Sequence, residues 1–408
     1  MISTQELHIQ GRKLAKRSGQ NPMAVFDSRI DEGDLDGSGT PQMLRHVKHQ
    51  ALMRSYQGRY TLLPSSLIDD GRQESILDRL DRHYDPRTMR DLDALRLDLE
   101  AELVVPLVEE AGRRMDGVDV KAYVAELLPA IRATPPSAFL DFLKASPQRD
   151  HYYRHFLIQS SVDLLAEASA SALGVIGEFG EPQSALFRIL IDEFGYGEHS
   201  KKHSVLFRNT IRGFGLDTEY NAYWPLFDTP ALAVHNIIHF MFQTPRHFFK
   251  QVGFLLYAET SYQHSTGEHF RYLRQFHPGV DGTYFGEHAH IDIHHTAMVI
   301  DEVVKPLVAK YGAEAGHDIL TGAEMTRAAF AASDAHMLKV CKAFEAASAD
   351  GAAVYGMARG KLSEGHCKTP DSAQQEVVGL IQVGGIGQVT EPGRFSSFPD
   401  GAIGRTVK

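Results

Sequence analysis

Residues 285–296 read Phe-Gly-Glu-His-Ala-His-Ile-Asp-Ile-His-His-Thr and crowd four histidines and two acids into twelve positions of a 408-residue chain. A helix turns by about 100° per residue, so His288, Asp292 and His295 would project within about 60° of one another. Imidazole and carboxylate together are the ligands of oxygen-activating iron. This stripe is therefore half of a metal site, and other helices must supply the rest, because one helix face cannot surround an ion.

Two other interpretations of this stretch stay open. The segment has the composition of a solvated, His-rich helix without a metal. In addition, His290 and His294 lie four residues apart, which is the spacing of a histidine pair that binds a single zinc ion. The spacing within this segment alone does not exclude either one.

The composition is that of an ordinary globular protein, and the chain is long enough for two or three domains and a large core. Apolar residues make up 43% and charged residues 23% of the sequence. It holds no run of about 18 uncharged apolar residues, and its first twenty residues carry charges where a signal peptide has its apolar stretch. We therefore expect a soluble, cytoplasmic protein without a membrane partner.

Charge and cysteine content narrow the function further. The formal charge of -10, without a dense basic run, argues against nucleic acid as the partner. Two cysteines, Cys341 and Cys367, form neither a disulfide framework nor a four-cysteine metal site, and they agree with a reducing compartment. Histidine is the outlier, because many of the 21 histidines concentrate between His199 and His295.

Periodic apolar residues predict an all-α protein. The clearest case is residues 89–112, where apolar side chains recur at i, i+3 and i+4. A weak boundary at 112–118 divides the chain into an N-terminal helical domain (1–112), a helical core (113–348) and an extended or disordered tail (349–408). The Leu/Val stripe of the first domain is either a dimerisation surface or an intramolecular packing face.

Two acidic residues stand isolated on apolar runs. Glu167 lies in the helical pattern of residues 151–178, among small and apolar neighbours, and Glu259 follows the apolar run 254–258. A buried carboxylate is costly unless it is paired or bound to metal. Both are candidate ligands, although a carboxylate satisfied in the core or at a helix end is an equally good explanation of Glu167.

A third acid, Glu193, precedes His203 by ten residues. On a regular helix the two side chains would diverge by roughly 80°. Gly195 and Gly197 lie between them and permit a bend that turns both inward. His199 is either a partner of these ligands or solvated.

The candidates add up to four carboxylates and three imidazoles: Glu167, Glu193, His203, Glu259, His288, Asp292 and His295. That set suits two irons, since carboxylates neutralise the cations and imidazoles complete each shell, with positions left for O2. Ferritin-like carboxylate proteins use two Glu-x-x-His motifs. Glu287-x-x-His290 is the one such spacing in these helices that would serve, so a ferritin-like site is the weaker interpretation.

This set resembles the signature of the haem-oxygenase-like diiron oxidases and oxygenases. Their pattern is a lone Glu, a later His, a further Glu and a closing His-x3-Asp-x2-His helix, matched here by Glu167, His203, Glu259 and the His288–His295 segment. The resemblance covers roughly residues 113–348 and implies a haem-oxygenase-like helical bundle. The preceding helices are similar in placement to dimerising helices of some members, which implies a homodimer.

The resemblance also implies how the ligands divide between the irons. One iron would take Glu167, His203 and His295, and the other would take His288 with Asp292. Glu259 would bridge the irons or complete a shell.

Members of this family catalyse different reactions, and Glu193 decides between them. Some desaturate or fragment amino acids and fatty acids, and others oxygenate amine or guanidine nitrogens. Glu193 looks like the seventh ligand of the N-oxygenases; the other members lack it or place a Glu three residues before the His, where this chain has Ser200. The tail after Ser348 does not look like the cupin domain fused to some N-oxygenases.

We therefore expect an O2-dependent oxygenase of an amine-bearing, amino-acid-like small molecule in specialised metabolism. The chain shows no flavin or nicotinamide signature, so an external electron donor would supply the reductant. The alternatives are a diiron oxidase that desaturates its substrate or cleaves a C–C bond, a zinc hydrolase built on His290 and His294, and a non-catalytic metal-binding protein. Tyr257, Tyr262, Tyr284 and His290 are candidates either for substrate contact or for hydrogen bonding to the ligands.

Overall fold

A computed structural model of the chain describes residues 40–58, 75–178, 180–220, 223 and 226–349. Every regular element in these ranges is helical, which confirms the all-α prediction. None of the described helices combines the length and the hydropathy that crossing a bilayer requires. The expected extended tail (349–408) falls almost wholly outside the described residues.

The chain divides into two compact units that are not contiguous in sequence. Among described residues, the first unit takes those up to Leu103, those from Glu219 to Asn236 and those from Val340 on, and the second takes Val104–Thr218 and Ile237–Lys339. The linear boundary expected at 112–118 coincides with the turn between two helices of the second unit, α7 (Val105–Met115) and α8 (Val120–Arg132).

The first unit pairs α3 (Thr40–Gln57) with α6 (Pro86–Leu103), and α5 (Ile76–His83) precedes α6 in the chain. Leu92 and Leu99 of α6 are buried. Tyr56 of α3 is fully buried and donates a hydrogen bond of 2.7 Å to Glu100, whose carboxylate also pairs with Arg96 at 2.6 Å. The Leu stripe of this region is thus an intramolecular packing face at least in part, and dimerisation stays a prediction.

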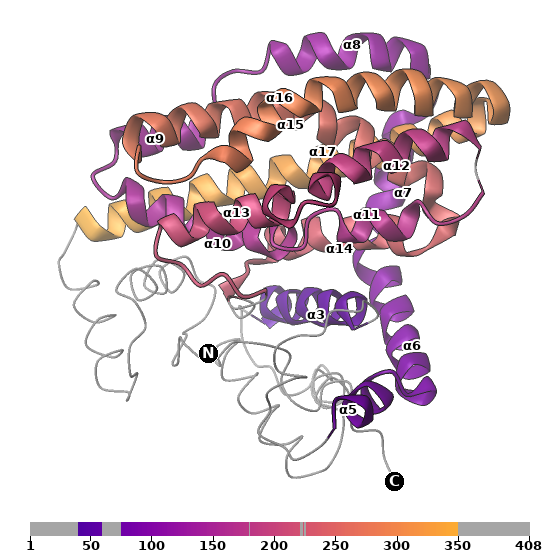
Figure 1. Cartoon of the computed structure of the whole chain (residues 1–408), viewed down its shortest axis with the longest axis horizontal. Coiled ribbons are helices and arrows are strands. Elements are labelled where there is room, and N and C mark those ends of the chain that lie inside the picture. Colours follow the sequence, from indigo (N-terminus) through magenta and orange to yellow (C-terminus); the bar gives the residue numbers. More distant parts are fainter. Residues whose placement is uncertain (1–39, 59–74, 179, 221–222, 224–225, 350–408) are drawn as a thin grey trace. The chain divides into compact units, whose positions relative to one another are not determined.

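The second unit holds most of the helices, and Figure 1 shows α15 and α16 running side by side within it. Short connections at prolines separate its helices where the sequence predicted: Pro135-Pro136 lies between α8 and α9, and Pro245 between α14 and α15. In chain order the remaining α- and π-helical elements are α9 (Ala138–Ala145), α10 (Arg149–Leu164), α11 (Ser169–Gly174), α12 (Glu181–Glu193), α13 (His203–Gly213), α14 (Thr229–Gln243), α15 (Phe248–Phe276), α16 (Thr283–Met298), a π-helical segment (Val299–Val304) and α17 (Lys305–Ala349). Two of them are divided between the units, because α14 up to Asn236 and α17 from Val340 on belong to the first unit.

The end of the helical core differs from the sequence prediction. The helix that carries His288 was expected to continue to about Gly312, but α16 ends at Met298 and six π-helical residues follow. The next helix is interrupted at Gly312 (φ 77°, ψ −163°) and resumes at once, eight residues before the expected start at Thr321. Gly312 breaks the helix because it adopts a positive φ, whereas Ala313 and the residues after it favour helix.

Two glycines allow α15 and α17 to touch backbone to backbone. A Cβ on Gly253 would lie 1.9 Å from the carbonyl oxygen of Ile319, and one on Gly322 would lie 2.0 Å from that of Lys250. Both distances are far inside van der Waals contact. This close approach fixes α15 just before Glu259, so the packing of the two helices sets the position of a candidate ligand.

We expect Gly253→Ala to lower the free energy of unfolding by about 1–3 kcal/mol, because the added methyl group forces the helices apart. The matched control is Gly267→Ala in the same helix, where the new Cβ would lie 3.7 Å from that of Ala289, an ordinary contact. The control should be neutral or stabilising, since Ala favours helix over Gly. Urea unfolding followed by circular dichroism measures both, and equal stability of the two variants would contradict the close approach.

Candidate metal centre

Glu167 lies at a break between two helices rather than inside one. Residues 151–178 were predicted as a single helix, but α10 ends at Leu164, and Ala168 adopts a left-handed conformation (φ 64°) before α11 begins. That conformation costs about 1 kcal/mol for a residue with a Cβ. At this break Oε1 of Glu167 accepts a 2.7 Å hydrogen bond from the hydroxyl of Tyr284 and lies 3.5 Å from Nε2 of His288.

Glu193 lies at the end of one helix and His203 at the start of the next. Glu193 is the last residue of α12 and His203 the first of α13, with two short 3-10 turns between them. Gly195 and Gly197 both take positive φ angles, as the predicted bend requires. The bend brings Oε2 of Glu193 to 2.7 Å from Nδ1 of His203.

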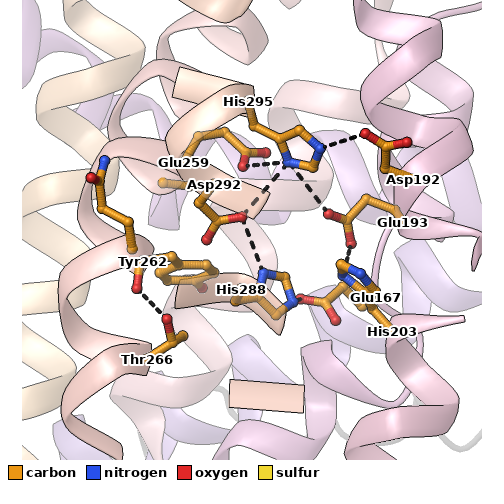
Figure 2. Close-up of polar contacts among 12 residues, drawn as sticks. Glu167, Asp192, Glu193, His203, Glu259, Tyr262, Thr266, His288, Asp292 and His295 are labelled. Atoms are coloured by element: carbon orange, nitrogen blue, oxygen red, sulfur yellow. Dashed lines mark hydrogen bonds and ion pairs between the residues drawn. The ribbon is translucent and has the colours of Figure 1, made fainter. Parts of the chain in front are cut away.

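The stripe on α16 faces the interior, as the helical periodicity predicted. His288, Asp292 and His295 are all buried. Oδ1 of Asp292 lies 3.3 Å from Nδ1 of His288 and 3.7 Å from Nδ1 of His295. Glu259 comes from the neighbouring α15 and places Oε2 3.1 Å from Nδ1 of His295. Figure 2 shows these side chains converging from several helices.

The seven candidate residues form two adjacent groups of potential ligand atoms. Within each group the atoms lie within 4.8 Å of one another; the first group is Glu167, Glu193, His203 and His288, and the second is Glu259, Asp292 and His295. Glu193 lies between the groups, since its second oxygen, Oε1, is 3.8 Å from Nδ1 of His295. Asp292 likewise lies between His288 and His295.

This grouping corrects the division that the family resemblance implied. His295 was expected beside Glu167 and His203, but it lies with Glu259 and Asp292, while His288 contacts both Glu167 and His203. The reason is the rise of the helix. His288 and His295 are separated by about 10 Å along α16, so each reaches a different group.

The carboxylates of the centre favour protonated histidines. Burial opposes the charged imidazole of His295, but Glu259, Glu193 and Asp192 together raise its pKa to about 10. Asp292 and Glu167 overcome burial in the same way and raise the pKa of His288 well above its usual range. Protons thus occupy nitrogens that would bind a metal.

The residues present fit iron. Three buried atoms of these side chains, Oε2 of Glu167, Oδ2 of Asp292 and Nε2 of His288, make no hydrogen bond. Buried polar and charged groups persist when they are paired or coordinate a metal. A mixture of carboxylate oxygens and imidazole nitrogens matches the preference of non-haem iron.

The zinc pair suggested by spacing receives no support from the geometry. His290 and His294 are exposed on the other face of α16, with ring centroids 5.9 Å apart. No further His, Cys, Asp or Glu joins them in a ligand group in the part of the chain that the structure describes. His199 is exposed as well.

Three further residues contact the centre. Asp192, which the sequence analysis missed, places Oδ2 3.1 Å from Nε2 of His295. Its signal was only its position beside Glu193 at a helix end. Tyr284 was one of four polar candidates and is hydrogen-bonded to Glu167, while the ring of Tyr262 meets that of His288 edge-on at 6.2 Å.

Metal binding is expected to release protons. His288 and His295 hold raised pKa values, so at neutral pH an incoming divalent ion must displace their protons, and affinity should rise as the pH increases from 6 to 9. Anaerobic calorimetric titration with Co(II) in two buffers of different ionisation enthalpy should show about one or two protons released per chain. Identical heats in the two buffers would contradict this.

Comparison with known proteins agrees with this geometry. Residues 154–331 match the sequence model of a family described as iron-containing redox enzymes. The nitrosourea synthase of Streptomyces achromogenes subsp. streptozoticus is 38% identical over 183 residues, which are 45% of this chain and 39% of that protein. The similarity thus spans about two fifths of the relative's length. All seven candidate residues fall inside the matched segment, so residues 154–331 are similar to the iron-containing redox enzymes at the candidate centre itself.

Proposed function

We propose that this protein is an O2-dependent non-haem diiron oxygenase that transfers an oxygen atom to the nitrogen of an amine-bearing, amino-acid-like small molecule in specialised metabolism. The observation that carries the proposal is the position of Glu193. Its two oxygens face His203 in one ligand group and His295 in the other, at 2.7 and 3.8 Å. A carboxylate so placed is suited to holding two ions next to each other.

Charge and ligand number support two irons. Glu167, Glu193, Glu259 and Asp292 carry four negative charges when ionised, which offset the four positive charges of two Fe(II) ions. Without Glu193, each group still offers three ligand side chains. Three protein ligands with open positions are typical of iron sites that bind O2. The bound iron would supply the electrons that activate O2, and the surrounding side chains exclude water and fix the ligand geometry.

Two features support nitrogen as the oxygen acceptor. Glu193 matches the additional carboxylate of N-oxygenases, and the relative is named for making a nitrosourea, a compound with oxygen on nitrogen. Hydroxylation of an amine consumes one O2, two electrons and two protons and yields a hydroxylamine and water. The electrons would come from an external donor, so an electron donor would be a partner of this protein.

The test begins with metal content. Protein loaded anaerobically with Fe(II) and freed of excess metal should contain about two irons per chain. It should then consume O2 when given a chemical reductant and a suitable amine from a panel of amino acids and their guanidine and amine derivatives. With 18O2, the product should gain one labelled oxygen on nitrogen.

Other outcomes would replace the proposal. A single zinc without O2 consumption would indicate a hydrolase. Two irons with O2 consumption but a desaturated or fragmented product that lacks label on nitrogen would indicate an oxidase that cleaves C–H or C–C bonds.

A further inference from the structure

His295 presents its two ring nitrogens to different surroundings. Nδ1 faces the carboxylates of the centre, with Glu259 at 3.1 Å and Glu193 at 3.8 Å. Nε2 faces away from them and lies 3.1 Å from Oδ2 of Asp192 (Figure 2). A neutral imidazole carries one N–H, so a carboxylate at Nε2 keeps the proton there and leaves the lone pair of Nδ1 free for a metal.

Tyr196 follows Asp192 by four residues. The Asp192 carboxylate raises the pKa of the Tyr196 hydroxyl, so the two groups interact. Tyr196 is 72% exposed and adopts φ 55° and ψ 29°, a left-handed conformation that is unfavourable for a residue with a Cβ. Burial of the ring does not explain this conformation. Strained residues of this kind persist where the surroundings hold them, often at functional sites.

The turn that contains Tyr196 packs closely against the turn that follows it. Gly195 and Gly197 flank it, both with positive φ. A Cβ on Gly195 would lie 2.5 Å from the backbone carbon of Lys201, so the turn packs directly on the next one. The end of α12, with Asp192 and Glu193, is therefore fixed relative to the start of α13 and His203.

We propose that Asp192 is a positioning residue for His295. This inference rests on the proposed function, because it requires a metal at Nδ1 of His295. A carboxylate on the outer nitrogen of a ligating histidine fixes the ring and its tautomer and increases the basicity of the ligating nitrogen. Both effects strengthen metal binding without contact between Asp192 and the metal.

The experiment compares Asp192→Ala and Asp192→Asn with the wild-type protein by anaerobic titration with Co(II), followed by its visible absorption. Asp192→Ala should weaken one of the two Co(II) sites by about 10–100-fold and shift its absorption band. Asp192→Asn should fall between Asp192→Ala and wild type, because the amide oxygen still accepts the Nε2 hydrogen bond but carries no charge.

The matched control is Glu181→Gln, which removes an exposed carboxylate at the start of the same helix and should bind Co(II) like wild type. If the wild-type protein does not bind two Co(II) ions, the proposed function fails, and the inference fails with it. If the wild type binds two and both Asp192 variants match it in affinity and spectrum, the inference is overturned while the proposed function stands. Should Asp192→Ala fold poorly by circular dichroism, the isosteric Asp192→Asn decides the question by the same measurements.

Discussion

Asp292→Ala is expected to abolish O2 consumption while leaving the helical circular dichroism spectrum unchanged. Asp292 is fully buried and lies between the two buried histidines of its helix, 3.3 Å from His288 and 3.7 Å from His295. Even residues that only orient metal ligands lower activity by about 10–100-fold when they are replaced, so loss of a ligand should exceed that. The helix should persist because Ala has the highest helix propensity.

Replacement of His295 by alanine should have the same effect, and the chain offers a control at the next position. His294 is exposed on the opposite side of α16, whereas His295 is fully buried. We expect His294→Ala to retain wild-type O2 consumption and iron content. The reverse pattern, with activity lost in His294→Ala and kept in iron-loaded His295→Ala, would place the metal at the exposed histidine pair.

The α16 half of the centre was predictable because it depends on a single helix. The periodicity of a helix fixes the relative directions of side chains three, four and seven residues apart. Because the segment is helical, His288, Asp292 and His295 lie on one face of the helix, and that face is buried. The bend between Glu193 and His203 was predictable in a weaker sense, since glycines permit a positive φ but do not require it.

The arrangement between helices was not predictable from spacing. Which histidine joins which carboxylate depends on where helices cross, and the close approach of α15 and α17 at Gly253 has no local sequence signal. The break beside Glu167 depends on Ala168, a non-glycine residue at positive φ that propensity would place in a helix. Asp192 was missed because neighbouring residues on a helix point about 100° apart, so it was not expected to share a site with Glu193.

The expected effect of changing Glu193 follows from its place between the two ligand groups. Glu193→Gln keeps the size of the side chain but removes its charge. Three ligand side chains remain in each group, so iron content should stay near that of the wild type. The two irons would lose the carboxylate that faces both groups, and we expect oxygenated product per O2 consumed to fall by about tenfold or more, an effect of about 1.4 kcal/mol or more on the partition between productive and unproductive turnover.

Glu193→Asp distinguishes the contribution of the negative charge from that of the side-chain length. Aspartate keeps the charge but is one methylene shorter, so it cannot approach His203 and His295 together as Glu193 does. It should therefore resemble Glu193→Gln in coupling O2 consumption to product. Glu198→Gln is the control, because Glu198 lies in the same connection, is exposed and pairs with Lys201 at 2.6 Å. Wild-type coupling in both Glu193 variants, or an iron-loaded structure in which Glu193 turns to solvent, would remove the main support for N-oxygenation. An oxidase that desaturates its substrate or cleaves a C–C bond would then be the better description, because six ligands without the additional carboxylate match those members of the family.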